Sequence, residues 1–109
     1  MKFYQGNGEK MKGKLIKTRS DIQKIQKDTE MICLQFRPSI IDAFDIKKRT
    51  PRLKHIIFSS EAYLYTLGTK TINYFKQNNI EISKLNNRRV QKTNESRVLT
   101  DIVINMESE

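Results

Sequence analysis

The sequence predicts a small α/β domain with a mainly parallel, four-stranded sheet in which each strand is followed by a helical segment (β-α-β-α-β-α-β-α). Apolar runs begin near residues 14, 31, 55 and 80, and a segment of helical character follows each of them. From the second run onward the spacing is close to 24 residues. A single-wound, repeat-like sheet is therefore the alternative arrangement.

The length of 109 residues suits one domain with a single modest core. Residues 1–10 are polar and are expected to form a flexible leader. The single α/β domain should cover residues 11–106, and residues 107–109 should fray.

The first strand and helix are predicted from weak signals. Lys14–Thr18 contains few apolar residues, which favours a strand at the edge of the sheet. Ser20 can cap a short helix that ends near Lys27.

Residues 31–60 carry the strongest pattern, that of a strand, a helix and a second strand. Met31–Phe36 is almost continuously apolar, which is typical of a central strand, and Pro38 must follow its end. Ser39 is the expected N-cap of the helix, with Asp42 at the capping-box position. Thr50 precedes a proline and should end this helix.

The next strand is predicted at His55–Phe58, and Ser60 should cap a long helix after it. This helix contains Gly68, which costs about 1 kcal/mol relative to alanine. Ile80–Leu85 alternates between apolar and polar residues and predicts a last, half-exposed strand.

A final helix is predicted near the C-terminus, with Thr93 or Asn94 as its cap. The residues Ile102-Val103-Ile104 within it are also β-prone. Its apolar side would carry Val98, Leu99, Ile102, Val103 and Met106.

The segment Leu34–Ser39, read Leu-Gln-Phe-Arg-Pro-Ser, resembles an uncharacterised domain family of methanogenic archaea. The resemblance continues through Asp42–Phe44, Thr50–Ile56 and the region Ser60–Ile82. In that family a Gly-Asp-Val-Trp-Gly-His-Arg-like segment follows the last strand, whereas here residues 86–90 read Asn-Asn-Arg-Arg-Val. The resemblance implies an archaeal, cytoplasmic origin and brings no activity with it.

The composition favours a polyanionic partner. Lys and Arg outnumber Asp and Glu by 21 to 12, giving a net charge of +9. Solubility is the alternative reason for this excess. The single cysteine, Cys33, lies within a predicted buried strand and fits a reducing compartment. No apolar run is long enough for a membrane span, so we expect a cytoplasmic protein.

An anion site is one candidate function. Arg37 and Ser39 follow one central strand, and Ser59 and Ser60 follow the next. Ligands of parallel sheets bind at these carboxyl ends, where helix N-termini add positive partial charge. Serines are expected as simple N-caps in any case, and Arg37 can instead pair with Asp42 or Glu61.

Two basic groups are candidates for contact with a nucleic-acid backbone. If they share one face they form a footprint, and if they lie on opposite faces they only solubilise the protein. With Arg37, the candidate binding residues are Lys47, Lys48, Arg49, Arg52 and Lys54 in the first group and Lys84, Arg88, Arg89 and Lys92 in the second.

Aromatic residues offer a further clue, because exposed rings stack on the bases of single strands. Tyr63, Tyr65 and Tyr74 lie on the predicted long helix, and Tyr65 falls off its apolar stripe. Catalysis finds little support, since His55 is the only histidine and no metal-ligand spacing, phosphate loop or acid/base pair is evident.

The sequence therefore favours a small, non-catalytic basic module, without metal or cofactor, that binds RNA or DNA backbone. The alternative is a protein-interaction or assembly subunit that docks on a partner, or on a second copy, through the predicted C-terminal helix. A regulatory domain for phosphate-bearing small ligands is a third possibility.

Overall fold

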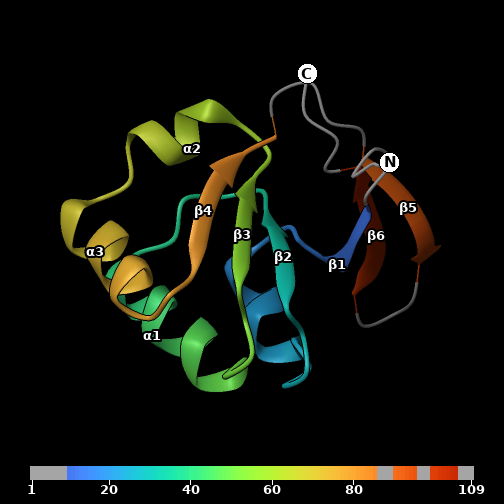
Figure 1. Cartoon of the computed structure of the whole chain (residues 1–109), viewed down its shortest axis with the longest axis horizontal. Helices are drawn as coiled ribbons and strands as arrows, with labels where there is room; N and C mark the ends of the chain where they lie inside the picture. Colours follow the sequence, from blue (N-terminus) through green and yellow to red (C-terminus); the bar gives the residue numbers. More distant parts are fainter. Residues whose placement is uncertain (1–9, 86–89, 96–98, 106–109) are drawn as a thin grey trace, which may run out of the picture.

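The computed structural model describes residues 10–85, 90–95 and 99–105. At its centre lies a six-stranded sheet of order β4-β3-β2-β1-β6-β5 (Figure 1). The strands are β1 (Lys10–Ile16), β2 (Met31–Leu34), β3 (His55–Phe58), β4 (Glu81–Lys84), β5 (Val90–Glu95) and β6 (Thr100–Asn105). The helical segments are the 3₁₀ helix η1 (Arg19–Lys24) and the α-helices α1 (Ile40–Arg49), α2 (Glu61–Tyr65) and α3 (Thr69–Gln77).

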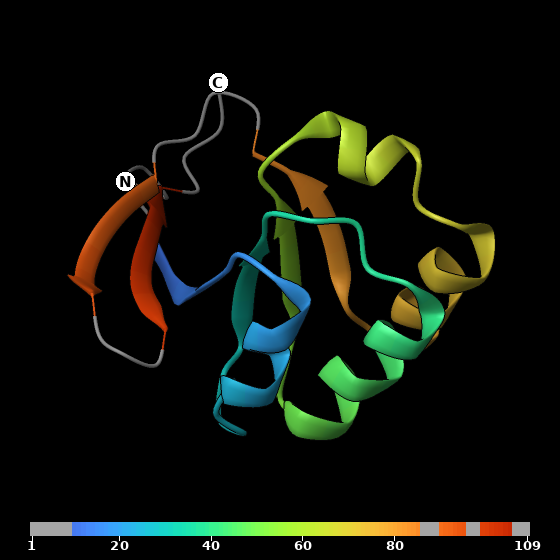
Figure 2. The ribbon, with the colours of Figure 1, turned by 180° about the vertical axis from the view of Figure 1, so that it is seen from behind.

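The strands β1 to β4 are parallel and lie side by side in chain order. This order is that of a single-wound sheet, because every crossover moves one strand in the same direction. The helical segments accordingly lie on one face of the sheet, as the front and back views show (Figures 1 and 2).

The sheet has six strands rather than the predicted four, and the predicted C-terminal helix is wrong. Residues of that helix form β6 and the end of β5, which pair as an antiparallel hairpin. Along β6 the side chains alternate, with Ile102 and Ile104 buried on one face and Val103 half-buried on the other. This two-residue alternation and the β-branched side chains outweigh the helical spacing.

The pairing of β6 with β1 also corrects the position of the first strand. β1 lies between β2 and β6, so it is an interior strand and not the predicted edge. It begins at Lys10, the last residue of the predicted leader, and residues 1–9 lie outside the described ranges. Because Lys10 to Gly13 pair with β6 alone, the sequence of β1 by itself could not reveal this partner.

The helix predicted after Ser60 is broken into α2 and α3. Ser60 caps α2, its Oγ accepting from the Ala62 N–H at 3.2 Å. Gly68 lies in extended backbone between the two helices and is the N-cap of α3. The helical run already ends at Tyr65, with Thr66 as the C-cap of α2, and Gly68 instead precedes a new helix.

The strand–helix–strand unit of residues 31–60 is confirmed. The Oγ of Ser39 accepts from the Asp42 N–H at 3.1 Å, and the Ser39 N–H donates to the Asp42 carboxylate at 2.9 Å. α1 ends at Arg49, with Thr50 as its C-cap. In contrast, the short helix after β1 is a 3₁₀ helix capped by Thr18, two residues before the predicted Ser20.

Both faces of the central strands are buried. One face packs under the helices, where Ile32, Leu34, Ile56 and Phe58 share a cluster with Phe75 of α3. The opposite face holds a second cluster of Leu15, Met31, Cys33, Ile57, Ile102 and Ile104. Within the described ranges no helix is long and apolar enough to cross a membrane.

The burial of Cys33 makes a prediction about pH. Burial raises the pKa of this thiol from 9.0 to about 11. Above the ordinary pKa the unfolded thiol ionises while the folded thiol keeps its proton. The stability that this provides is complete below pH 9 and is lost as the pH rises from about 9 through about 11. Urea unfolding across this pH range should show a fall in the free energy of unfolding that is absent from Cys33→Val. An equal fall in the wild-type protein and in Cys33→Val would contradict the prediction.

Candidate anion-binding groove

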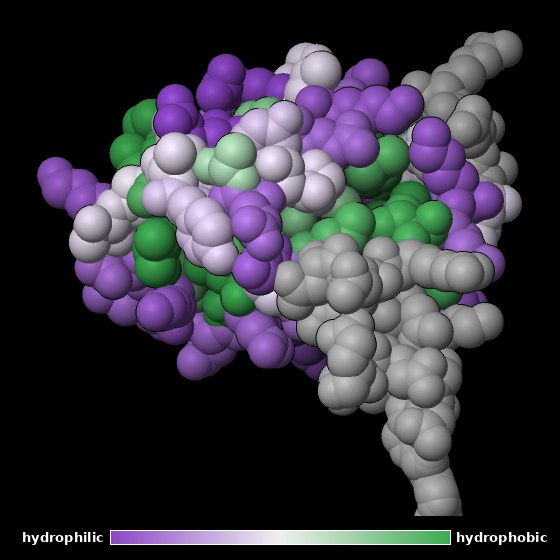
Figure 3. Space-filling model, turned by 90° about the horizontal axis from the view of Figure 1, so that it is seen from above, coloured by the Kyte–Doolittle hydropathy of each residue, from purple (hydrophilic) through white to green (hydrophobic). Residues whose placement is uncertain are grey.

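A groove lies where the parallel strands β1 and β2 end, beside α2. Its volume is about 600 Å³. It is lined by Lys17, Thr18, Arg19, Phe36, Arg37, Ala62, Tyr63 and Thr66. These residues follow β1, follow β2 or belong to α2 and its C-cap, so the topology of parallel strands brings them together. Figure 3 views the molecule from above, the side on which α2 lies in Figure 1, and the described surface there is mainly hydrophilic or pale.

The backbone after β1 is held by a carboxylate. The N–H groups of Lys17 and Thr18 donate to Asp21 Oδ2 at 3.0 and 3.2 Å. This turn places Lys17 at the groove with an exposed side chain. No ion pair of its ammonium group is found within the described part of the chain.

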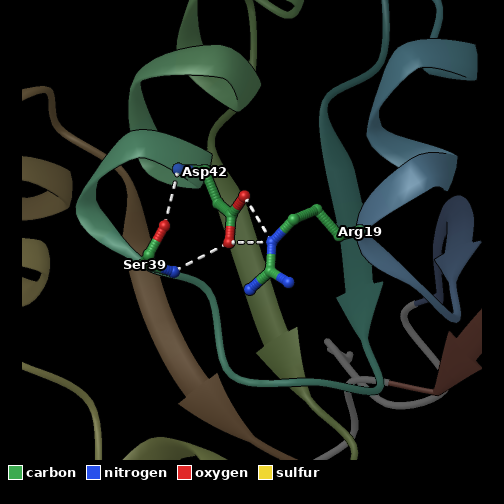
Figure 4. Close-up of polar contacts among 3 residues, drawn as sticks. All are labelled: Arg19, Ser39 and Asp42. Atoms are coloured by element: carbon green, nitrogen blue, oxygen red, sulfur yellow. Dashed lines mark hydrogen bonds and ion pairs between the residues drawn. The ribbon is translucent and has the colours of Figure 1, made fainter.

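Arg19 is oriented by an ion pair with α1 (Figure 4). Its Nε lies 2.9 and 2.8 Å from the two carboxylate oxygens of Asp42, a residue that is 3 % exposed. The guanidinium carbon also lies 5.6 Å from the centre of the Phe36 ring, within the range of a cation–π contact. Because Asp42 bonds to Nε, the two terminal nitrogens of Arg19 stay outside this contact (Figure 4).

The helix N-terminus at Ser39 does not form the predicted anion cradle. The capping box fills it, because the Asp42 carboxylate accepts the Ser39 N–H and pairs with Arg19. Ser60 likewise serves as the cap of α2. The interpretation of the serines as caps is therefore correct for these two residues, and the charges of the groove come from Lys17, Arg19 and Arg37.

Arg37 is exposed and lines the groove. Neither acidic partner considered from the sequence is bound to it, since Asp42 pairs with Arg19 and Glu61 pairs with Lys84. Within the described residues Arg37 has no ion pair, so its guanidinium is available to a ligand.

A further cation, Lys84, lies at the end of β4. Lys84 Nζ lies 2.8 Å from Glu61 Oε1 and 3.0 Å from the Tyr65 hydroxyl. The hydrogen bond to Glu61, and then that to Tyr65, raise the pKa of Lys84 above its usual range. Lys84 is thus a protonated group whose charge is largely offset by Glu61.

The first predicted basic group lies at the opposite end of the sheet. Lys47, Lys48 and Arg49 form the last turn of α1, and Arg52 and Lys54 follow before β3 begins. Lys47 Nζ donates to the Pro51 carbonyl at 3.1 Å, and Arg49 donates to Gln23 Oε1 at 2.9 Å. These cations stabilise the negative end of the helix dipole.

The two predicted basic groups therefore do not meet as one footprint. Lys84 ends β4, whereas the first group precedes β3, and parallel strands place these positions at opposite edges. Lys92 lies on β5, across the sheet from β4. Arg88 and Arg89 lie outside the described residues.

A second cleft of about 560 Å³ has no comparable excess of positive charge. Its charged lining consists of Lys12, Lys14, Asp28, Glu30 and Asp101, and Lys14 is paired with Asp101. Three carboxylates beside two ammonium groups disfavour an anion there.

Sequence reasoning also missed the surroundings of His55. The imidazole is buried, with Nε2 3.0 Å from Ser83 Oγ and Nδ1 3.7 Å from Glu81 Oε1 across the β3–β4 pair. No group of three metal-ligating side chains occurs among the described residues. For Lys17 and Arg19 a signal was present, since Lys17 lies near the end of the predicted strand Lys14–Thr18 and Arg19 directly follows it, but the predicted anion site involved only the ends of β2 and β3.

Comparison with known proteins adds a family. No curated protein and no solved structure matches the chain. Residues 12–96 match the N-terminal domain of DUF1699, a family of unknown function. The match covers most of the chain and includes the groove residues, while β6 follows it. It gives no source, so the archaeal origin implied by the resemblance stays a prediction. The chain belongs to the DUF1699 family of unknown function.

Proposed function

We propose that this protein is a small, non-catalytic binding module for the phosphate backbone of RNA or DNA, and that the groove beside α2 is its binding site. The observation that carries the proposal is the arrangement of Lys17, Arg19 and Arg37 around one groove. Two of these cations lack an ion pair within the described residues, and the third is held in place by Asp42.

The groove differs from the basic run at the opposite edge because its cations surround one cavity. α1 begins on the side of the groove and ends beside Lys48 and Arg52. The negative end of the helix dipole therefore offsets a small part of the charge of the basic run, whereas the positive end is satisfied by the Asp42 carboxylate. Planar guanidinium groups such as Arg37 also bind phosphate oxygens in a bidentate manner.

The salt dependence of binding tests the proposal. A labelled oligonucleotide titrated with the protein should bind at low salt. For three phosphate contacts the affinity should fall roughly 20- to 40-fold between about 50 and 200 mM salt. Fluorescence anisotropy measures the affinity at each salt concentration.

Matched charge reversals locate the site. The double variant Lys17→Glu/Arg37→Glu should lose binding at moderate salt. The control Lys48→Glu/Arg52→Glu changes the net charge equally, on the opposite edge, and should retain most of the affinity. Thermal unfolding of both variants confirms that they are folded.

Two outcomes contradict the proposal. Binding that is lost in the Lys48/Arg52 variant and kept in the Lys17/Arg37 variant would move the site to the basic run. No binding at low salt, together with a stable complex in size-exclusion chromatography, would favour the assembly role instead. The helix predicted to dock on a partner is absent from the described residues, since Ile102 lies in β6. Leu99 and Ile102 are buried, so neither is available for docking.

A further inference from the structure

Aromatic rings accompany the cations on this side of the molecule. Phe36 and Tyr63 line the groove and are half-buried. Tyr65 is 67 % exposed, the most exposed of the large hydrophobic side chains in the described ranges. Tyr65 belongs to the same helix as Tyr63, so an exposed ring lies on the element that forms one wall of the groove.

The short helix α2 connects the exposed ring to the groove. Ala62, Tyr63 and Thr66 line the groove, and Tyr65 directly precedes Thr66. The Tyr65 hydroxyl accepts a hydrogen bond from Lys84 at the end of β4, two strands from the end of β2. Adjacent strands lie about 4.8 Å apart, so a nucleic-acid strand that contacts Arg37 has to extend roughly 10 Å along this edge of the sheet to place a base at Tyr65.

The ring of Tyr65 is held at one point. Its hydroxyl accepts a hydrogen bond from Lys84 Nζ at 3.0 Å, and Lys84 Nζ lies 5.4 Å from the ring centre. Lys84 is itself fixed by Glu61 at 2.8 Å. A tethered, exposed ring loses little conformational entropy on stacking, which suits it to hold a planar partner.

We infer that the groove binds single-stranded rather than double-stranded nucleic acid, with the phosphates on Lys17, Arg19 and Arg37 and a base stacked on Tyr65. This inference rests on the proposed function. The faces of bases are accessible in single strands and hidden within a duplex. A stacking ring therefore contributes to the binding of single strands and not to the binding of a duplex. The readout is tolerant of sequence, because every base offers a π-face.

Substitutions at Tyr65 test the inference. Tyr65→Ala should weaken binding of a mixed-sequence single strand roughly 5- to 150-fold and leave the affinity for a duplex of the same sequence unchanged. Tyr65→Phe keeps the ring and should restore most of the single-strand affinity. Tyr63 lines the groove and is therefore not a suitable control, so Tyr74→Phe, on α3 outside the groove, controls for the loss of a tyrosine hydroxyl.

A fluorescent reporter provides an independent measurement. The chain contains no tryptophan, so Tyr65→Trp introduces a single indole at the stacking position. Addition of a single-stranded oligonucleotide should quench its emission, and addition of the duplex should not.

The outcomes separate this inference from the function on which it rests. If single strand and duplex bind the wild-type protein equally and Tyr65→Ala changes neither affinity, the inference is wrong and the backbone-binding function stands. If neither oligonucleotide binds at low salt, both are wrong. If only the duplex binds, the inference is overturned and the groove binds the phosphates of a duplex.

Discussion

Replacing Gly13 by alanine should destabilise the protein by about 3 kcal/mol and lower its Tm by roughly 10–20 °C. A Cβ at Gly13 would clash with the backbone oxygen of Met31 and lie 2.8 Å from its Sδ and Cε atoms. The side chain of Met31 can move only within a fully buried cluster, and its carbonyl belongs to the β2 backbone. The strands would have to separate where β1 passes β2. Chemical and thermal unfolding measure the loss.

A second glycine provides the control for this prediction. A Cβ at Gly68 would meet only Thr71 Oγ1, at 3.9 Å, and the residue is the N-cap of α3. Gly68→Ser should therefore be neutral or slightly stabilising, because serine is a preferred N-cap. A Gly13→Ala protein as stable as the wild type would show that β1 and β2 do not approach as closely as described.

Replacing Asp42 by alanine should cost about 2–3 kcal/mol. The substitution removes the acceptor of the Ser39 N–H and the partner of Arg19 from a position that is almost completely buried. The cost stays below that of a fully buried ion pair, because the Arg19 side chain is 64 % exposed and regains water. Urea unfolding of the variant measures the change.

The neighbouring acid on α1 is the matched control. Asp45 makes no ion pair within the described residues, and Asp45→Ala should change the stability by less than about 0.5 kcal/mol. Arg19→Ala leaves the Asp42 carboxylate buried without its cation and should cost about 1–3 kcal/mol. If Asp42→Ala and Asp45→Ala were equally mild, the capping box and the Arg19 pair would contribute nothing measurable.

The local predictions that succeeded depend on interactions within a few residues. The capping box of Ser39 and Asp42 and the stop at Thr50 involve contacts at a separation of three or four positions. The buried strands β2 and β3 follow from runs of four and three apolar residues, respectively. Each of these features is encoded in one short stretch, so it can be identified without knowledge of the rest of the chain.

The predictions that failed depend on distant partners. Residues 100–105 carry both helical and extended tendencies, and the pairing of Ile102 with Gly13 and of Ile104 with Met11 selects the strand. The break between α2 and α3 allows Leu67 to be buried in the core cluster that also contains Phe75. Local propensity is a weak preference, and tertiary contacts outweigh it.

The candidate site shows the same division. Arg37 was predicted as an anion ligand because it follows a central strand, and it does line the groove. Lys17 and Arg19 join it only because β1 lies next to β2, and the ion pair that orients Arg19 spans 23 positions of the sequence. The two basic groups are close in charge and composition, yet the parallel order of β3 and β4 separates them.

The sequence by itself determined the α/β class, the four strands that prove to be parallel, the caps of α1 and α2 and the excess of positive charge. These properties arise from hydrophobic periodicity and from short-range hydrogen bonds, which each segment carries within itself. Only the tertiary structure decided the two additional antiparallel strands, the break between α2 and α3 and the grouping of Lys17, Arg19, Arg37 and the aromatic rings. The physical reason is that strand pairing and ion pairs join residues far apart in the chain, and their free energy exists only once the chain has folded.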